Sequence, residues 1–310
     1  MKIAFLFPGQ GAQTVGMGST FPEIDHYFER ADQVLPFSLR ECMFEGPQEV
    51  LTETYHAQPA LLTVGAVIAD KLMREGITPD FVAGHSLGEY TALVASGGLS
   101  YEDGVQTVYE RGRHMTEAVP KGEGAMAAVI GGDRAMIEEV TAAITANGHL
   151  VQPANMNSPG QIVISGTKEG ISEAQEKLPT HGARRVIPLD VSGPFHSDLM
   201  KGAAESLKQT FEKMTWHSLR TPLVKNIDAS ISSSVDEVRE GLVEQLYSPV
   251  EWERSMRTLL DEGVTHFIEC GPGRVLKGLM RKIDRKAVVY TIEDETSFHE
   301  VVEQLKEETK

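Results

Sequence analysis

The segment Gly84-His85-Ser86-Leu87-Gly88 constrains the fold of this chain more than any other stretch of its sequence. It matches the pattern Gly-x-Ser-x-Gly and stands between the apolar run Phe81–Gly84 and an Ala-rich pattern with helical spacing. Glycine is needed on both sides of the serine because a Cβ there would clash in a tight strand-to-helix turn. Such a turn lifts the hydroxyl clear at a helix N-terminus, so the segment predicts an α/β fold with Ser86 as a nucleophile.

Other apolar runs predict the remaining strands and helices of a large α/β body. The expected strands cover residues 3–7, 81–84, 222–224, 265–268 and 288–291. Apolar residues between 60 and 72 recur with helical spacing, and the pattern predicts a helix with Pro59 in its first turn, where proline is favoured. A last helix is expected over residues 297–306.

The middle of the chain has shorter elements, bounded by turn signals such as Gly131-Gly132 and Asn157-Ser158-Pro159-Gly160. In order, the expected elements are a strand at 125–130, a helix at 134–147, strands at 150–154 and 161–165, a helix at 168–178 and a strand at 185–189. This βαββαβ order is the ferredoxin-like pattern. We therefore expect a small ferredoxin-like subdomain (residues 124–196) inserted in a larger body (residues 1–123 and 197–310).

A nucleophilic serine needs a base, which is usually histidine. His85 is adjacent to Ser86, so its side chain is expected to point away from the hydroxyl. His196 follows an expected strand and a Gly-Pro turn, where loop-borne catalytic residues are often placed. The pattern alone leaves open whether His196 is the base or a histidine that caps an element or fills the core.

Two more residues are candidates for binding groups of the site. Gln10 stands between Gly9 and Gly11 after the first strand, where a backbone N–H can face a ligand, as an oxyanion hole requires. The same spacing also fits a simple tight loop. Arg111 lies in an expected helix and is either a solvated surface residue or a fork for a carboxylate.

Composition disfavours several other classes of function. The 310 residues include 29 Lys and Arg against 45 Asp and Glu, which gives a net charge of −16 and disfavours nucleic acid and anionic membranes as partners. Cys42 and Cys270 cannot form a disulfide framework, and no Cys/His spacing suggests zinc. The longest uncharged apolar stretch, residues 59–69, is too short to span a bilayer, so we expect a cytoplasmic protein.

Taken together, several segments resemble those of the malonyl-CoA:acyl carrier protein transacylases, which supply malonyl groups to fatty acid synthesis. In chain order they are Phe7-Pro8-Gly9-Gln10-Gly11, Gly84-His85-Ser86-Leu87-Gly88-Glu89, Asn157-Ser158-Pro159-Gly160-Gln161, Gly193-Pro194-Phe195-His196, Gln245-Leu246-Tyr247 and Glu269-Cys270-Gly271-Pro272-Gly273. Each segment is weak evidence alone. In this order they cover essentially the whole chain, so together they are highly specific.

The resemblance implies an α/β-hydrolase-like body with a ferredoxin-like insert that carries the catalytic histidine at its exit. By the family's motifs, Ser86 is the nucleophile and His196 its general base. Gln10 and Leu87 would supply backbone N–H groups to the oxyanion hole, and Arg111 would bind the free carboxylate of the malonyl group. The family orients its histidine through a backbone carbonyl, which here belongs to Gln245.

The resemblance also implies the reaction and its partners. A malonyl group passes from malonyl-CoA to the phosphopantetheine thiol of acyl carrier protein through a malonyl-serine, in a ping-pong cycle. The coenzyme A thioester is a substrate, and no metal or other cofactor is expected. An acidic carrier needs a basic surface, for which the candidates are Arg184 and Arg185 or the cluster Arg274, Lys277, Arg281, Lys282, Arg285 and Lys286. These residues are otherwise simply solvated faces.

Three alternatives remain at the level of sequence. A standalone acyltransferase for polyketide synthesis would carry the same motifs and differ only in its carrier. A serine esterase or thioesterase would use the same turn at Ser86 but release free acid. A catalytically inactive carrier-binding scaffold would not need Ser86, His196 and Arg111 together.

Overall fold

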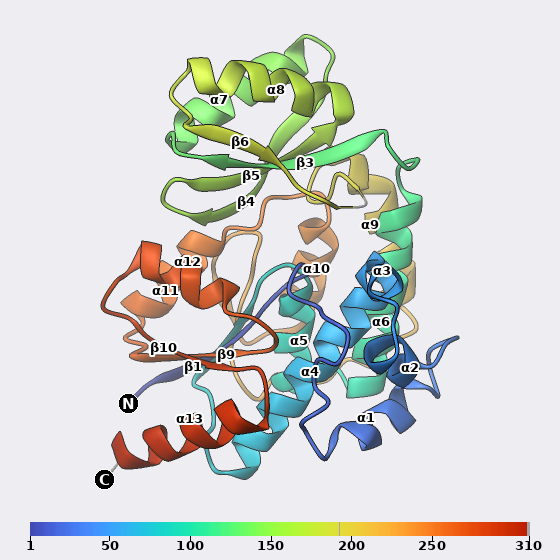
Figure 1. Ribbon diagram of the computed structural model, residues 1–310, viewed down its shortest axis with the longest axis vertical. Coiled ribbons are helices and arrows are strands. Elements are labelled where there is room, and N and C mark those ends of the chain that lie inside the picture. The colour runs from blue at the N-terminus through green and yellow to red at the C-terminus, as the bar shows by residue number, and fades with distance from the viewer. Residues whose placement is uncertain (192, 309–310) are drawn as a thin grey trace.

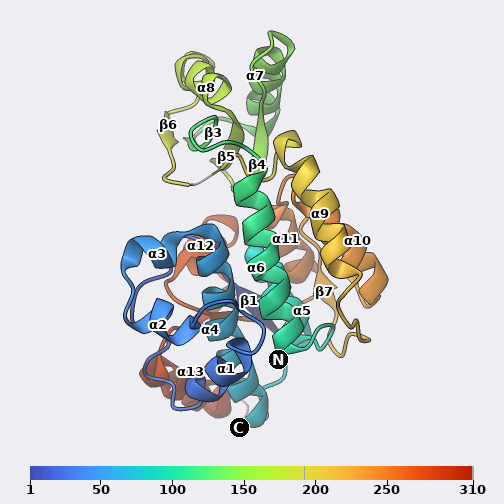
Figure 2. The ribbon, with the colours of Figure 1, turned by 90° about the vertical axis from the view of Figure 1, so that its right-hand side faces the viewer.

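The computed structural model describes residues 1–191 and 193–308, and these residues form two β-sheets (Figure 1). Ser192, which belongs to the expected insert, lies outside the described residues. The large sheet belongs to the body of the molecule, and the small sheet stands at one end of its long axis (Figures 1 and 2). The chain is therefore α/β with a small antiparallel sheet beside a large, mostly parallel one, as the sequence predicts.

Within the described residues, the large sheet has the strand order β10-β9-β1-β2-β7-β8. The bounds are β1 Ile3–Phe7, β2 Phe81–Gly84, β7 Leu223–Val224, β8 Ile231–Ser232, β9 His266–Cys270 and β10 Val288–Ile292. Neighbours from β10 to β7 pair in parallel, and β8 pairs antiparallel with β7. The sequence predicts all of these strands except β8, which is only two residues long.

Both faces of the large sheet are buried at its central strand β1, as a central parallel strand requires. All five residues of β1 are buried, and they alternate between two hydrophobic clusters. Phe5 and Phe7 pack with α4 (Thr54–Arg74) and α5 (Leu87–Ala95), whereas Leu6 packs with α11 (Trp252–Asp261) and α12 (Val275–Ile283). α6 (Tyr101–Glu117) packs on α4 and belongs to the first cluster.

The start of α4 differs from the prediction. The helix begins at Thr54, so Pro59 lies inside it rather than in its first turn. Proline has no N–H to donate to the preceding turn and normally disrupts a helix interior. Ala57 and Gln58 are fully buried, and this packing outweighs the missing hydrogen bond.

Several helices surround this core. α1 (Ile24–Ala31), α2 (Leu39–Phe44) and α3 (Gln48–Thr52) lie around α4, and the sequence patterns did not predict them. α9 (Lys201–Phe211), α10 (Val235–Gln245) and the short 3-10 turn Asp198–Met200 follow the small sheet. α13 (Glu295–Glu308) is the last helix, close to the expected range, and it packs on β10. No helix in residues 1–191 and 193–308 is both long and apolar enough to cross a membrane.

The small sheet has the order β4-β5-β3-β6, and all its neighbouring strands are antiparallel. Its elements are β3 (Gly124–Ile130), α7 (Arg134–Ala146), β4 (Val151–Ser158), β5 (Gln161–Thr167), α8 (Lys168–Thr180) and β6 (Arg185–Pro188). This confirms the βαββαβ order. α7 and α8 cover the outer face of the sheet, and the other face is turned toward the body (Figure 1).

Backbone hydrogen bonds tie the small sheet to the body. Val250 donates to the Ala154 carbonyl at 2.9 Å, and Met156 donates to the Val250 carbonyl at 2.8 Å. Lys282 of α12 also donates from Nζ to Gln161 Oε1 at 2.6 Å. These contacts fix β4 and β5 above the end of the large sheet from which the loops of β1 and β2 emerge.

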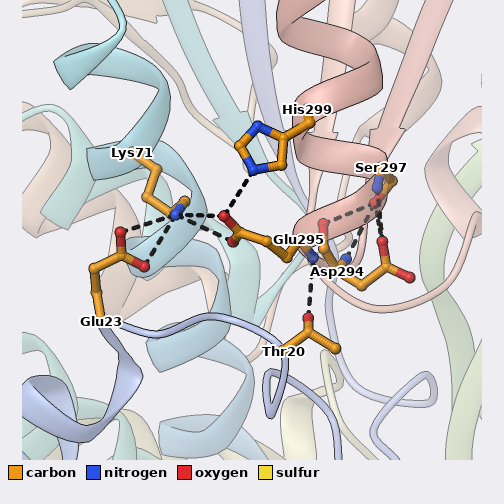
Figure 3. A network of polar contacts seen from close by, with 7 residues as sticks. All are labelled: Thr20, Glu23, Lys71, Asp294, Glu295, Ser297 and His299. Carbon is orange, nitrogen blue, oxygen red and sulfur yellow. Dashed lines mark hydrogen bonds and ion pairs between the residues drawn. The ribbon is translucent and has the colours of Figure 1, made fainter.

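A buried lysine ties three distant parts of the body together (Figure 3). Lys71 of α4 donates to both oxygens of Glu23, just before α1, at 2.8 and 3.0 Å. It also pairs with Glu295, the first residue of α13, at 3.1 Å. The ammonium group is thus surrounded by carboxylates, as a buried charge requires.

Candidate functional site

Ser86 occupies a strained turn between β2 and α5. Its φ of 52° and ψ of −108° lie outside the regions that serine normally adopts. A Cβ on Gly84 would lie 1.9 Å from the Gly88 carbonyl, and a Cβ on Gly88 would lie 2.0 Å from the Phe7 carbonyl oxygen. Both glycines are therefore required for the turn, which presents the Ser86 side chain at the N-terminus of α5.

His196 lies beside this hydroxyl on a loop that leads out of the small sheet. Its Nε2 is 2.8 Å from Ser86 Oγ, and its Nδ1 is 2.7 Å from the Gln245 carbonyl oxygen. Because that carbonyl can only accept, Nδ1 carries the proton and Nε2 is free to accept one from the serine. Asp198, which follows His196 closely in the sequence, pairs with Lys201 at 3.0 Å rather than with the imidazole.

The environment of His196 keeps its ring neutral. The side chain is buried, and burial, followed by the positive charge of Arg111, lowers the pKa of His196 to about 3. The hydrogen bond to the Gln245 carbonyl acts in the opposite direction. The imidazole is therefore unprotonated and ready to act as a base at neutral pH.

Arg111 reaches the same hydroxyl from α6. Its side chain is fully buried, and Nη2 donates to Ser86 Oγ at 3.2 Å and to Gln245 Oε1 at 2.9 Å. Nη1 donates to Gln58 Oε1 at 2.9 Å, and the guanidinium carbon lies 5.1 Å from the centre of the Tyr90 ring. Burial lowers the pKa of Arg111, although a guanidinium remains charged in proteins.

No carboxylate in the part of the chain that the structure describes forms an ion pair with Arg111. Neutral amides and a hydroxyl hold the guanidinium instead. A buried cation without a direct ion pair is costly, so the site favours an anionic ligand. A carboxylate is the group that the planar fork of arginine matches best.

Leu87 follows Ser86 in the chain, and Gln10 lines the same cavity as Ser86. Leu87 is the first residue of α5, so its N–H is one of the first-turn amides that lack an acceptor within the helix. A Cβ on Gly9 would lie 2.8 Å from the His85 carbonyl oxygen, so the loop that carries Gln10 runs against the turn at Ser86. The Gln10 side chain accepts from Gln58 Nε2 at 3.1 Å.

A cavity of about 280 Å³ leads to Ser86 between the two parts of the molecule. It is lined by the loop after β1 with Gln10, by strands of the small sheet, by Phe195 and His196, and by Val275, Leu276 and Leu279 of α12. The exposed residues Lys277 and Arg281 lie on this same helix. The cavity is mostly apolar, with a few polar groups gathered around the hydroxyl, as in a typical ligand site.

Comparison with known proteins agrees with this geometry. Residues 4–309 match the family model of the acyl transferase domain. A malonyl CoA-acyl carrier protein transacylase of Bacillus subtilis (strain 168) is 50% identical over 311 residues, which cover 99% of this chain and 98% of that protein. The protein of the same name from Staphylococcus aureus (strain MRSA252) is 42% identical over 306 residues, 96% of this chain and 99% of its own. The chain belongs to the acyl transferase family.

Solved structures of this family share the whole fold. The malonyl CoA-acyl carrier protein transacylase of Coxiella burnetii has a TM-score of 0.94 at 38% identity, with 98% of each chain covered. A malonyl-transacylase in complex with a type II polyketide acyl-carrier protein has a TM-score of 0.95 at 38% identity, with 98% of this chain and 100% of that chain covered. Like other members of the family, the chain is an acyltransferase.

Several residues that surround the acyltransferase site were not predicted from the sequence. Asn226 accepts from the Ser86 backbone N–H at 2.8 Å and donates to the Gly84 carbonyl at 2.7 Å, so it fixes the turn from a distant loop. Gln58 accepts a hydrogen bond from Arg111. The His85 ring is turned toward Asn157, with 2.7 Å between His85 Nε2 and Asn157 Oδ1. Only Asn157 stood in a quoted motif, and a lone amide in a sequence gives no sign of its partner.

The acidic and histidine side chains of residues 1–191 and 193–308 do not gather into groups of three or more that could hold a metal ion. Cys42 and Cys270 are buried free thiols.

Proposed function

We propose that this acyltransferase moves a malonyl group from malonyl-CoA to the phosphopantetheine thiol of acyl carrier protein, for use in fatty acid synthesis. One observation carries the proposal. The Ser86 hydroxyl lies within hydrogen-bond distance of a neutral histidine, at 2.8 Å, and of a buried arginine with no carboxylate partner among the described residues, at 3.2 Å. A nucleophile, its base and a site for a free carboxylate thus meet at one atom.

In the first half-reaction, His196 Nε2 takes the proton of Ser86 while Oγ attacks the thioester carbonyl. The carbon–sulfur bond then breaks, and the coenzyme A sulfur leaves with the proton that His196 held. The product is a malonyl ester of Ser86. The Gln245 carbonyl stabilises the imidazolium that forms in between, because it accepts the Nδ1–H bond at 2.7 Å.

In the second half-reaction, the carrier's thiol gives its proton to His196 and attacks the ester carbonyl. The carbon–oxygen bond breaks, and the proton returns from His196 to Ser86 Oγ. Both half-reactions exchange one acyl bond for another, so atoms and electrons balance without a redox partner or a cofactor. Coenzyme A enters only as the thioester substrate and the released thiol.

Two further groups complete the proposed site. The backbone N–H groups of Gln10 and Leu87 would receive the oxyanion of each tetrahedral intermediate, supported by the position of Leu87 at the N-terminus of α5. Arg111 would bind the malonyl carboxylate. An acetyl group leaves the buried guanidinium without this partner, so Arg111 should favour malonyl over acetyl thioesters.

We propose that the acidic carrier docks near Lys277, Arg281 and Lys282. Lys277 and Arg281 are exposed one helical turn apart on α12, the helix that also lines the cavity, and Lys282 is fixed by Gln161. The pair Arg184 and Arg185, which is also exposed, lies at the start of β6 away from this helix and is the second candidate surface.

We also propose the catalytic body to comprise residues 1–123 and 197–310, and the small subdomain residues 124–196. The start of β3 at Gly124 supports the first limit. His196 would then lie at the exit of the insert, in reach of both parts. We place the reaction in the cytoplasm, which the two free thiols support, since disulfides are rare there.

The test is the intact mass of the protein after brief incubation with malonyl-CoA and no acceptor, with Ser86→Ala as the control. A persistent gain of one malonyl group in the wild type, absent from the control, supports the proposal. Free malonate without an adduct would instead indicate an esterase or thioesterase. Neither adduct nor turnover would leave only a carrier-binding scaffold.

A second carrier is favoured by one specific observation. The structural similarity to a malonyl-transacylase bound to a type II polyketide acyl-carrier protein, at a TM-score of 0.95, makes a polyketide carrier the alternative acceptor. Purified malonyl-enzyme, offered fatty acid and polyketide carriers at equal concentration, distinguishes the two. Faster transfer to the polyketide carrier would overturn the assignment to fatty acid synthesis.

A further inference from the structure

Glu89 is a buried carboxyl group directly behind the nucleophile that the mechanism above does not use. It lies in the first turn of α5 and is 1% exposed. Oε2 accepts from Gln245 Nε2 at 2.7 Å and from the Asn226 backbone N–H at 3.3 Å. Oε1 has no hydrogen-bond partner among the described residues.

The Gln245 carboxamide connects this carboxyl group to the arginine of the site. Its oxygen accepts from Arg111 Nη2 at 2.9 Å, and Nη2 also donates to Ser86 Oγ. Its nitrogen has only two hydrogens but lies near three acceptors: Glu89 Oε2 at 2.7 Å, the Ser86 carbonyl at 3.0 Å and Asn226 Oδ1 at 3.2 Å. Glu89 makes the shortest of these contacts.

The two ends of this amide are not interchangeable. If the carboxamide were reversed, its oxygen would face the acceptor Oε2 of Glu89, and its NH₂ group would face the cationic Nη2 of Arg111. Both contacts would be unfavourable in a buried, low-dielectric site. An acceptor at position 89 therefore selects the orientation in which Gln245 holds Arg111.

We propose that Glu89 is a positioning residue for malonyl recognition, because it orients the Gln245 carboxamide that holds Arg111 beside Ser86. This inference rests on the proposed function, since it assumes that Arg111 receives the malonyl carboxylate. The acceptor oxygen, rather than the negative charge, performs this role. In agreement, burial raises the pKa of Glu89 to about 8 against its hydrogen bonds and the charge of Arg111, so the neutral carboxyl form is populated at pH 7.

The test compares single-turnover acylation of Ser86 by malonyl-CoA and acetyl-CoA in three enzymes: wild type, Glu89→Met and Glu89→Gln. Methionine keeps the length of the side chain but removes the acceptor, whereas glutamine keeps an acceptor oxygen without the charge. We expect Glu89→Met to lower the ratio of malonyl to acetyl rates at least about tenfold, equivalent to about 1.4 kcal/mol. Glu89→Gln should retain the ratio within about threefold.

Three results would overturn the inference. Equal losses for both thioesters in Glu89→Met would indicate support of the fold alone. A loss in Glu89→Gln as large as in Glu89→Met would assign the effect to charge. If Glu89→Met fails to fold, Glu89→Asp, which withdraws the acceptor by one methylene, is tested in its place, and an unchanged ratio there would also contradict the inference.

A double variant tests whether Glu89 acts through Gln245. In a Gln245→Met background, which leaves the backbone carbonyl for His196 in place, Glu89→Met should change the ratio less than about twofold. A full tenfold effect in that background contradicts the proposed route. If the wild type forms no malonyl adduct, the proposed function itself fails, and the role of Glu89 fails with it.

Discussion

Among the residues that the structure describes, two buried cations lie on neighbouring helices, and their surroundings are opposite. Lys71 of α4 is 8% exposed and lies between the carboxylates of Glu23 and Glu295 (Figure 3). Arg111 of α6 is fully buried, and its partners are the neutral groups of Gln58, Gln245 and Ser86. α4 and α6 pack against each other, so the difference lies in the partners and not in the part of the fold.

The pKa values of the two cations are shifted in opposite directions, in line with their different partners. Burial acts to lower the pKa of Lys71, but its hydrogen bonds to Glu23 and Glu295 outweigh burial and raise it. For Arg111, burial prevails and lowers the pKa. The comparison teaches that a cation with internal counter-charges supports the fold, whereas one left with neutral partners is available to a ligand's carboxylate.

The largest expected effect is on catalytic activity, which should depend on Arg111 and not on Lys71. Arg111→Ala should lower kcat/KM for malonyl-CoA about 100-fold, because hydrogen bonds to a charged group are worth about 1.5–3 kcal/mol. Acetyl-CoA, which has no carboxylate, should lose much less. Steady-state rates with both thioesters check this, and an unchanged malonyl preference would remove Arg111 from its role.

The burial of His196, together with the charge of Arg111, should also be visible in the pH dependence of the base. Because the pKa of His196 is lowered to about 3, the neutral form persists as the pH falls, and kcat/KM should show no acid limb near the ordinary histidine value. A histidine of ordinary pKa would instead lose about tenfold between about pH 7.5 and about pH 5.5. A titration limb in the wild type centred near pH 6.5 would contradict the lowered pKa.

Substitution of Lys71 should change the stability of the protein and leave its substrate preference unchanged. Lys71→Met leaves Glu23 and Glu295 facing each other, and we expect a loss of about 2 kcal/mol in the free energy of unfolding. The matched control, Arg257→Met, breaks the exposed pair with Glu253 and should cost less than about 0.5 kcal/mol. Urea titration measures both. A shift of the malonyl to acetyl ratio in Lys71→Met would contradict the assignment of Lys71 to stability alone.

The smallest effect concerns exposed cations, which are screened by solvent. Lys277→Glu combined with Arg281→Glu should raise the KM for acyl carrier protein about fivefold and leave the KM for malonyl-CoA unchanged. Arg74→Glu, at the end of α4 far from the small sheet, is the control (Figure 1). Equal changes in both KM values would exclude this face as the docking surface.

The turn at Ser86 and the small sheet were predictable because their determinants are local. Gly84 is required by its contact with Gly88 in the same turn, although Gly88 itself is required by the distant Phe7 of β1. The βαββαβ order follows from short runs with clear turn signals. The start of α4 was not predictable, since the packing that tolerates Pro59 comes from other elements. α2, α3 and β8 are too short to give a clear periodic pattern, whereas α1 has helical spacing at Ile24, Tyr27, Phe28 and Ala31 that could have predicted it.

The residues of the site also divide into those that the sequence could predict and those that it could not. Ser86 and His196 stood in segments that resemble a family, the resemblance also implied a role for Arg111, and the structure brings all three together. The amides that hold them did not stand out, because Asn226 reaches Ser86 across 140 residues and Gln58 reaches Arg111 across 53. Such contacts depend on tertiary structure, which no spacing in a single sequence encodes.

The central claim, that Arg111 is left with neutral partners in order to receive a carboxylate at Ser86, has one direct test. Equimolar malonyl-CoA and acetyl-CoA are offered together, without acceptor, to the wild type, Arg111→Ala and Lys71→Met, and intact mass identifies the acyl group on each protein. We predict a malonyl adduct on the wild type and Lys71→Met, and a predominantly acetyl adduct on Arg111→Ala. The same malonyl preference in all three proteins would contradict the account.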